Sequence, residues 1–443
     1  MKKLNITFCS FPDFTGNARA LYEYMIKRYG NNMNYTWIVH EEKNFDKVKK
    51  HNENAILMGT HEFENYISKT NVFFTTHADL TGDKNKCKNA IYIELWHGVG
   101  PKPGGFMANG ILDEDRIWYN KINKIIDYLI VPSEFWRPLF SSSFGLEYER
   151  VMPLGYPKLN LYLTSGSKDK ISKLIGEDAK KYSKIIFYMP TFRKGCGRKS
   201  SLKYSDNIIN LCNYEEKNLT DYLKKNNYLL LIKLHPSEET KKILATDCKN
   251  VKLISQKSME EYNYDINEIL SGGDVLITDY SSLGVEFLFL NKPVIYLSTD
   301  MKKYSESRGL IYENYDFWSS NTSISTLDEL INKLNYYLST SYKFDDYFYE
   351  KKKLWFDSLK NGGCDKICDF VFDEYSVSKK LVRNKCEVSI LKNEIRKREN
   401  IINEQIDTIK KLTESDIRLK EIENSKGWKL LEKIRKTKRR YFK

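Results

Sequence analysis

Two adjacent serines, Ser281 and Ser282, lie where a short apolar stretch gives way to a helical pattern. Residues 275–278 (Val-Leu-Ile-Thr) are typical of a buried parallel strand, and residues 283–290 carry an apolar helical face. Hydroxyls and unpaired backbone N–H groups at such a junction favour a phosphate group. The alternative is structural: Ser281 caps the helix and Glu286 complements the helix dipole.

A histidine directly follows another strand-like stretch, residues 90–96. His97 opens a loop rich in glycine and proline, and α/β sheets gather ligand groups at the carboxyl ends of their strands. Gly98 lets the backbone approach a ligand closely, and Lys102 adds a positive charge. A structural histidine in a rigid turn is the alternative. His77 also follows a strand-like stretch and is the weaker candidate.

The second half of the chain has further polar strand ends. Thr191 and Arg193 follow a strand-like stretch at 184–189, and His235 follows one at 228–234. Because carboxyl ends of parallel strands converge on one crevice, these groups and the serine pair could surround one ligand. Hydroxyl, guanidinium and imidazole groups without paired carboxylates suit a phosphorylated ligand better than glycosidic hydrolysis. No acidic cluster predicts a magnesium site, so we expect no cofactor and leave a divalent metal open.

The elements that must position these residues alternate between strands and helices. The strand-like stretches are residues 4–9, 35–40, 54–58, 71–75, 90–96, 127–131, 184–189, 228–234, 251–254, 275–278 and 293–297, with a further strand that begins at Val151 and ends in a proline-fixed loop before 158. The principal helical stretches are residues 18–29, 134–140 (capped by Ser133), 219–225 and 327–338, with a further one after 361. This alternation predicts an α/β fold with two doubly wound domains, residues 1–175 and 176–375.

Composition sets the tail apart from this body. A chain of 443 residues suits two domains and an appendage. Residues 378–443 carry 21 Lys and Arg against 10 Asp and Glu, which is +11 of the net charge of +13. The nearly neutral body gives no support for nucleic-acid binding. No apolar stretch approaches the roughly 18–20 residues of a transmembrane helix, and eight cysteines without C-x-x-C pairing suggest reduced thiols in a cytoplasmic protein.

The tail, residues 376–443, shows two patterns. Between 381 and 422 apolar residues recur every seven positions, which indicates a coiled coil and a possible homo-oligomer; a lone charged helix is the alternative. The recurring residues are Leu381, Val388, Ile395, Ile402 and Ile409. Residues 426–443 interleave Trp428 and aliphatic residues with lysine and arginine, which favours a helix on an anionic membrane surface. A nucleic-acid patch or a disordered basic end are the competing interpretations.

The ordered set of strand ends resembles the CDP-glycerol glycerophosphotransferase family, which makes teichoic-acid and related capsule polymers. The resemblance spans residues 1–372. Its motifs are Gly16-Asn17, Trp96-His97-Gly98 with Lys102, Gly155-Tyr-Pro-Lys158, Pro190-Thr-Phe-Arg193, Lys233-Leu234-His235-Pro236, Thr278-Asp279-Tyr280-Ser281-Ser282-Leu-Gly-Val-Glu286 and Arg308-Gly309. Each motif alone is weak, whereas the ordered set is specific.

The resemblance implies a GT-B-like fold: two Rossmann-like domains face a cleft, with the CDP-alditol donor on the second. It implies that His97 takes the proton of an acceptor hydroxyl attacking the β-phosphorus. His235, Arg193 and the serine pair would then stabilise the charge on the CMP leaving group. Implied substrate-binding residues are Trp96, Gly98, Lys102, Lys158, Thr191, Arg193, Lys233, Leu234, Asp279, Ser281, Ser282, Glu286 and Arg308.

Some positions depart from the family's motifs and leave the alditol open. Val99 and Gly100 replace Thr-Pro, Lys158 replaces Arg, and Glu286 replaces the usual Asp. The implied setting is the cytoplasmic face of a bacterial cell membrane, with a polyprenyl-linked or glycan acceptor. Two other functions stay open: a GT-B glycosyltransferase, which would release a nucleoside diphosphate from a nucleotide sugar, and a non-catalytic membrane scaffold.

Overall fold

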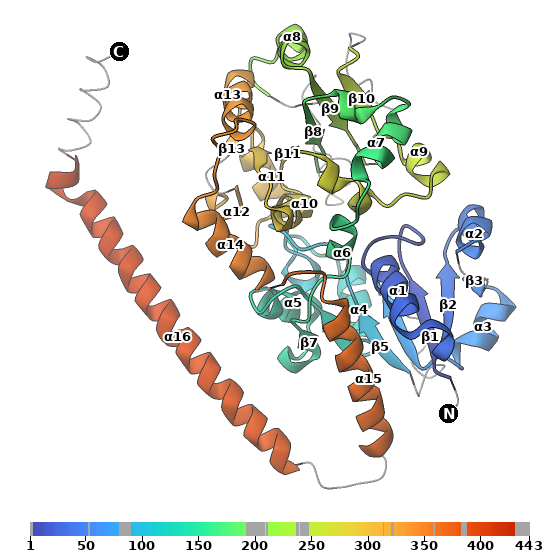
Figure 1. The fold of residues 1–443 in the computed structure, drawn as a ribbon. Helices are drawn as coiled ribbons and strands as arrows, with labels where there is room; N and C mark the ends of the chain where they lie inside the picture. The colour runs from blue at the N-terminus through green and yellow to red at the C-terminus, as the bar shows by residue number, and fades with distance from the viewer. Residues whose placement is uncertain are drawn as a thin grey trace, which may run out of the picture. The chain divides into compact units, whose positions relative to one another are not determined.

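The chain forms two compact units, Met1–Val371 and Phe372–Lys443. The computed structural model describes residues 3–51, 54–78, 90–191, 209, 211–235, 239, 248–312, 314–319, 323–357, 359–381 and 388–429. The first unit holds two parallel sheets, coloured blue to cyan and green to orange in Figure 1. The predicted α/β fold is therefore confirmed, while the limits 175 and 375 stay a prediction.

The first sheet has seven strands in the order β3-β2-β1-β4-β5-β6-β7. The strands are β1 (Asn5–Cys9), β2 (Asn34–Val39), β3 (Ala55–Leu57), β4 (Val72–Thr75), β5 (Ile91–Glu94), β6 (Tyr128–Ile130) and β7 (Val151–Met152). All neighbours pair in parallel. Most strand residues are buried, which explains why the strands appear in the sequence as apolar runs without alternation.

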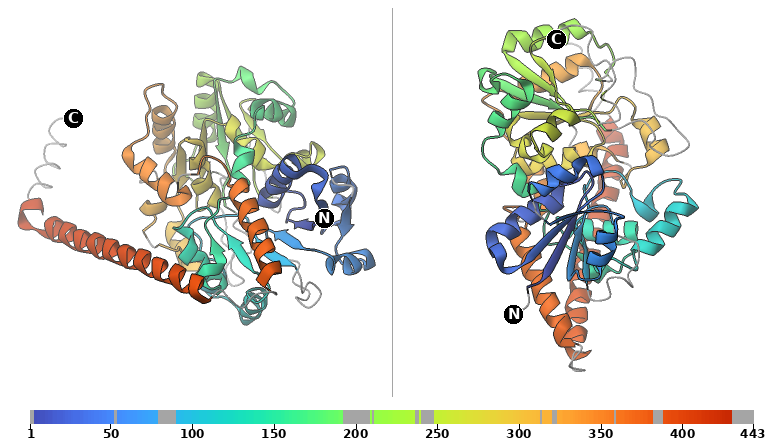
Figure 2. Two further views of the ribbon diagram at one scale, coloured as in Figure 1. Left: turned by 60° about the horizontal axis from the view of Figure 1, so that its bottom comes forward. Right: turned by 90° about the vertical axis from the view of Figure 1, so that its right-hand side faces the viewer.

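The second sheet has six parallel strands in the order β10-β9-β8-β11-β12-β13. They are β8 (Lys184–Tyr188), β9 (Tyr228–Ile232), β10 (Val251–Leu253), β11 (Val275–Thr278), β12 (Val294–Leu297) and β13 (Ser323–Ile324). Figure 2, in its right-hand view, shows the two sheets one above the other. In each sheet the strands that are followed by polar residues are neighbours. These strands are β1, β4 and β5 in the first sheet, and β9, β8 and β11 in the second.

Helices connect the strands, as the alternating pattern predicts. Those of the body are α1 (Gly16–Tyr29), α2 (Glu42–Lys49), α3 (His61–Ile67), α4 (Asp113–Ile122), α5 (Trp136–Phe144), α6 (Leu159–Tyr162), α7 (Ser167–Ile175), α8 (Glu216–Asn226), α9 (Gln256–Glu261), α10 (Ser282–Glu286), α11 (Met301–Arg308), α12 (Asp316–Ser319), α13 (Leu327–Tyr337), α14 (Asp346–Phe356) and α15 (Cys364–Leu381). The predicted cap at Ser133 is wrong. Helix α5 begins at Trp136, and the Ser133 hydroxyl donates to the Leu354 carbonyl of α14 instead, at 2.8 Å.

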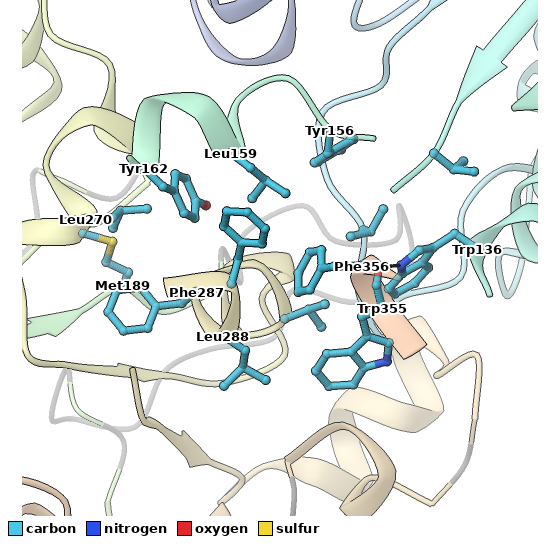
Figure 3. Close-up of a cluster of buried hydrophobic side chains, with 14 of the residues drawn as sticks. Trp136, Tyr156, Leu159, Tyr162, Met189, Leu270, Phe287, Leu288, Trp355 and Phe356 are labelled. Atoms are coloured by element: carbon cyan, nitrogen blue, oxygen red, sulfur yellow. Dashed lines mark hydrogen bonds between the residues drawn. The ribbon is translucent and has the colours of Figure 1, made fainter. Parts of the chain in front are cut away.

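One apolar core joins the two sheets. Figure 3 shows Trp136 of α5 beside Trp355 and Phe356 of α14, with Phe287 and Leu288 near the centre of the cluster. The Trp136 indole N–H donates to the Trp355 carbonyl at 2.9 Å. Each fully buried aromatic side chain contributes about 1.5–3 kcal/mol of burial free energy. This shared core therefore fixes the position of one sheet relative to the other.

After the second sheet the chain returns to the first. The Arg28 guanidinium of α1 lies 2.7 Å from the Asp369 carboxylate of α15, and the rings of Tyr128 (β6) and Phe370 (α15) meet edge to face at 4.9 Å. Where the chain returns, the backbones of Gly155 and Gly363 pack against each other. A Cβ on either residue would lie within 3 Å of the Cα of the other, so both positions need glycine. Helix α15 thus stabilises the first sheet.

The tail contains helix α16 (Val388–Asn424). Ile402, Ile406, Ile417 and Leu419 are exposed on this helix, each by 43–56%. Such exposure is what the apolar face of an unpaired coiled-coil helix would show, and the coiled coil stays a prediction. The side chains of Leu381, Val388 and Ile395 are outside the described part of the structure. Residues 430–443 also lie outside them. In the described part of the chain no helix is long and apolar enough to cross a membrane.

Candidate functional site

His97 is held in one tautomer at the carboxyl edge of the first sheet. Its Nδ1 lies 3.2 Å from the Thr76 carbonyl oxygen. A carbonyl only accepts, so Nδ1 carries the proton and Nε2 is left as the basic nitrogen. The imidazole stacks on His77 with ring centroids 4.2 Å apart, and on Trp96 at 4.2 Å. These contacts fix the plane of the ring, which is the orientation that a general base needs.

Three influences keep His97 neutral near pH 7. Desolvation by the surrounding protein, together with the positive charges of Lys158 and Lys102, lowers the pKa of His97 to about 4. His97 is nevertheless exposed to solvent. The shift favours the neutral imidazole, which is the form that can accept a proton.

Glu94 organises the two loops that carry His77 and His97. Its carboxylate is fully buried and accepts from the Thr75 hydroxyl (2.7 Å), the Ala78 N–H (2.8 Å) and the Trp96 N–H (2.8 Å). Trp96 adopts a φ of 50°, a strained conformation for a large side chain. The sequence reasoning missed Glu94. An acidic residue at the end of an otherwise apolar strand was the available signal.

A buried ion pair between Lys158 and Glu286 holds the His97 loop by hydrogen bonds. The Lys158 ammonium lies 2.7 Å from the Glu286 carboxylate and donates to the His97 carbonyl at 2.9 Å. Glu286 also accepts from the Tyr162 hydroxyl at 3.2 Å and from the Val99 N–H at 3.4 Å. Burial raises the pKa of Glu286, and the lysine opposes that shift. Glu286 comes from α10 of the second sheet, so this pair joins the loop to the Ser281–Ser282 helix.

Asn17 ties the same loop to the Lys158 segment. Its side-chain amide donates to the Leu95 and Trp96 carbonyls, at 2.9 and 2.8 Å, and its Oδ1 accepts from the Lys158 N–H at 2.9 Å. Asn17 is itself fully buried. Three motifs that lie far apart in the sequence therefore form one hydrogen-bonded network around His97.

The His97 loop packs directly on Ser282. A Cβ added to Gly98 would lie 2.9 Å from the Ser282 hydroxyl, and one added to Gly100 would lie 2.9 Å from the Ser282 Cα. Beyond the loop, the Ile311 N–H donates to the Pro101 carbonyl at 2.8 Å. Glycine is thus required at Gly100 for close approach of two backbones, rather than for a turn.

The replacement Gly100→Ala is expected to lower the rate of catalysis by pushing the His97 loop off Ser282. Overpacking of this kind costs about 1–3 kcal/mol. Gly104→Ala is the matched control, because a Cβ at Gly104 meets nothing within 4 Å and its φ of −120° suits any residue. Steady-state rates and melting temperatures of both variants provide the check. Equal rates for the two would contradict the close-approach interpretation.

The carboxyl edge of the second sheet brings together several of the predicted residues. The Thr191 N–H donates to the buried Asp279 carboxylate at 2.7 Å, which ties β8 to β11. Ser281 caps α10, since its hydroxyl accepts from the Leu283 N–H at 3.2 Å. The structural role of Ser281 is thereby confirmed, and its part in ligand binding stays a prediction. His235 follows β9 and is exposed.

Other predicted residues have different surroundings. Lys233 pairs with Glu239 at 2.8 Å, and Leu234 is buried in the core. Arg193 lies outside the described residues, and Arg308 ends helix α11 with a side chain that is also outside them. The structural alternative had Glu286 complement the α10 dipole, but Glu286 ends that helix and pairs with Lys158. Its predicted substrate contact stays a prediction. Among the described residues no group of three His, Cys, Asp or Glu could hold a metal ion.

Comparison with known proteins gives consistent matches. A family model described as CDP-Glycerol:Poly(glycerophosphate) glycerophosphotransferase matches residues 1–373. The chain is 31% identical over 315 residues to the teichoic acid glycerol-phosphate primase of Bacillus subtilis, covering 68% of this chain and 76% of that protein. It is 27% identical over 398 residues to the teichoic acid poly(ribitol-phosphate) polymerase of Bacillus spizizenii, covering 86% of this chain but only 59% of that protein.

A similar fold occurs among solved structures. A structure of the wall teichoic acid polymerase TagF superposes with a TM-score of 0.68 at 22% identity, covering 86% of this chain and 91% of that one. At this identity the likeness concerns the fold alone. It confirms the predicted GT-B-like arrangement of two α/β domains.

Proposed function

The chain belongs to the CDP-glycerol:poly(glycerophosphate) glycerophosphotransferase family and is a transferase of alditol phosphate from a CDP-alditol donor, and we propose that His97 is its general base. The acceptor is a hydroxyl of a polyprenyl-linked or glycan chain in teichoic acid or capsule synthesis. On this proposal residues 1–175 form the acceptor side and residues 176–375 the donor side. The observation that carries it is the packing of the His97 loop, from one sheet, on Ser282 of the other.

The proposed reaction is an in-line displacement at the β-phosphorus. The acceptor oxygen forms the new P–O bond while the bond from the β-phosphorus to the bridging oxygen breaks, so CMP leaves. His97 Nε2 takes the acceptor proton, because Nδ1 is already committed to the Thr76 carbonyl. Charge develops on the CMP phosphate, where His235, Arg193, Ser281 and Ser282 would donate hydrogen bonds.

The remaining predicted residues divide by their contacts. Trp96, Thr191 and Asp279 lie at the strand ends, and Lys102 adds a positive charge near His97; all four are proposed substrate contacts. Lys158 and Glu286 are already paired, as is Lys233 with Glu239. We therefore propose that Lys158 and Glu286 position the His97 loop and do not touch the donor.

The decisive experiment identifies the released nucleotide. Purified protein is incubated with CDP-glycerol, CDP-ribitol or UDP-sugars and a glycan-lipid acceptor, and the products are separated by chromatography. Release of CMP from one of the CDP-alditols is expected, and the preferred donor names the alditol. Release of a nucleoside diphosphate from a UDP-sugar would instead support a glycosyltransferase, and no release from any donor would favour a scaffold.

We also propose that residues 426–443 bind an anionic membrane surface and that residues 381–422 pair with a second copy of the chain. Each basic residue near such a surface contributes roughly 1 kcal/mol. Removing residues 426–443 is expected to abolish co-sedimentation with vesicles that contain anionic lipid. Neutral phosphatidylcholine vesicles serve as the control. Unchanged sedimentation of the truncated protein would refute the membrane role and leave the transferase proposal intact.

A further inference from the structure

A cavity that none of the predicted site residues line lies against β12 of the second sheet. Pro293 precedes β12 and lines this cavity, whereas Ser281 follows the carboxyl end of β11. Because β11 and β12 are parallel, the two positions lie at opposite edges. The cavity holds about 340 Å³, which falls in the range of small-ligand pockets, about 300–1,000 Å³. It is lined by the end of α13, the start of α14 and the loop between them, together with residues of β12, the end of α12 and Leu288.

Five tyrosines and two phenylalanines are among the fourteen residues that line the cavity. The Tyr342 ring lies 5.2 Å from Tyr336, 4.9 Å from Tyr337 and 5.0 Å from Phe344. Tyr336 is 58% exposed and Tyr347 is 41% exposed. A ring face carries negative charge density, which attracts the polarised C–H groups of a sugar or alditol. A connected set of aromatic rings beside a hollow, with Tyr336 and Tyr347 partly exposed, is therefore a candidate binding feature.

The charges on the wall favour an anion. Lys333 and Lys343 line the cavity, and the Lys333 ammonium lies 5.7 Å from the centre of the Tyr337 ring. Asp345 is the one carboxylate among the described lining residues. It already caps α14, where its Oδ1 accepts from the Phe348 N–H at 2.9 Å. Two ammonium groups beside tyrosine rings and hydroxyls suit a polyhydroxylated phosphate ester.

We propose that this cavity binds a sugar-phosphate or alditol-phosphate unit, outside the catalytic crevice. The choice of ligand rests on the proposed function, since the growing polymer supplies such units. Its phosphate lies between the two lysines and its carbon chain or ring lies on Tyr336 and Tyr347. A unit held here keeps the product attached between successive transfers, which makes longer polymers from each binding event.

Binding is tested directly with glycerol 3-phosphate and N-acetylglucosamine 1-phosphate, by saturation-transfer NMR on the full chain. Tyr336→Ala and Lys333→Gln are each expected to weaken binding about tenfold, the effect of losing one stacked ring or one charge-assisted contact. The matched control is Tyr349→Ala, because Tyr349 is 54% exposed on the same helix as Tyr347 but does not line the cavity. Tyr296 is left intact, since its hydroxyl donates to the Gly284 carbonyl of α10 at 2.8 Å.

Equal affinities in the three variants and the unmodified protein would overturn the proposal. So would preferential binding of CMP over both phosphates in the cavity, since that would indicate a nucleotide site. Product length provides a second readout: Tyr336→Ala is expected to give shorter polymers with an unchanged initial rate of CMP release. Failure of every CDP-alditol as a donor would remove the proposed function, whereas the binding experiment would still decide whether the cavity is a site.

Discussion

Replacing His97 with alanine is expected to lower the rate of CMP release by about 10²–10⁴-fold, the usual loss when a general base is removed. The acceptor alcohol is a weak nucleophile until its proton is taken, and Nε2 of His97 is the proposed acceptor of that proton. Steady-state release of CMP from the preferred CDP-alditol measures the loss. Donor affinity is expected to change little, because the proposed donor site is on the second sheet.

The control for this substitution is His61→Ala. His61 is an exposed histidine at the start of α3, so its loss should leave both the rate and the melting temperature unchanged. His77→Ala is expected to give a smaller loss of rate than His97→Ala, because His77 stacks on the His97 ring. Undiminished polymer formation by His97→Ala would refute the mechanism as drawn.

The pH dependence follows from the lowered pKa of His97. The base works only as neutral imidazole, so protonation abolishes it. Because the pKa of His97 lies below the ordinary value of 6.5, at about 4, the rate should stay flat from pH 8 down past 6. It should fall only as the pH drops toward that pKa. A fall in rate with a midpoint near pH 6.5 in the pH–rate profile would contradict the lowered pKa and indicate a solvated ring during turnover.

Most of the fold could be predicted because its strands are buried on both faces. Short apolar runs such as Val275–Thr278 identify such strands, and the polar residues just after them identify the edge where ligands gather. The strand β13 was missed because its two residues, Ser323–Ile324, lie in a polar stretch in which Ile324 is the single apolar residue between 319 and 326. The Ser133 cap was predicted wrongly because local preference was overridden by packing against α14.

The sequence predicted which residues lie at the strand ends of the site, but not which of them contact one another. Nothing local indicates that Lys158 and Glu286, 128 positions apart, pair with each other. Nor does the sequence show that Gly100 is required by the Ser282 backbone. Such contacts depend on how the two sheets face each other, which the shared aromatic core around Trp136 and Trp355 determines.

Breaking the Lys158–Glu286 pair is expected to have the largest effect on stability. Glu286→Gln leaves the Lys158 ammonium without its counter-charge, and this side chain is only 8% exposed. Removing one partner of a buried ion pair costs about 3–5 kcal/mol. Urea unfolding measures the loss. Asp169→Asn is the control, because its partner Lys180 is largely solvated, and no change is expected there.

The double variant Lys158→Met/Glu286→Leu separates stability from catalysis. Replacing both charges with apolar side chains of similar size removes the stranded charge, so the free energy of unfolding should recover most of the loss. Catalysis should not recover, because the His97 carbonyl and the Val99 N–H lose the groups that hold their loop. A double variant that regained both stability and rate would show that the pair is a packing feature. One that is stable and slow would establish Lys158 and Glu286 as positioning residues for His97.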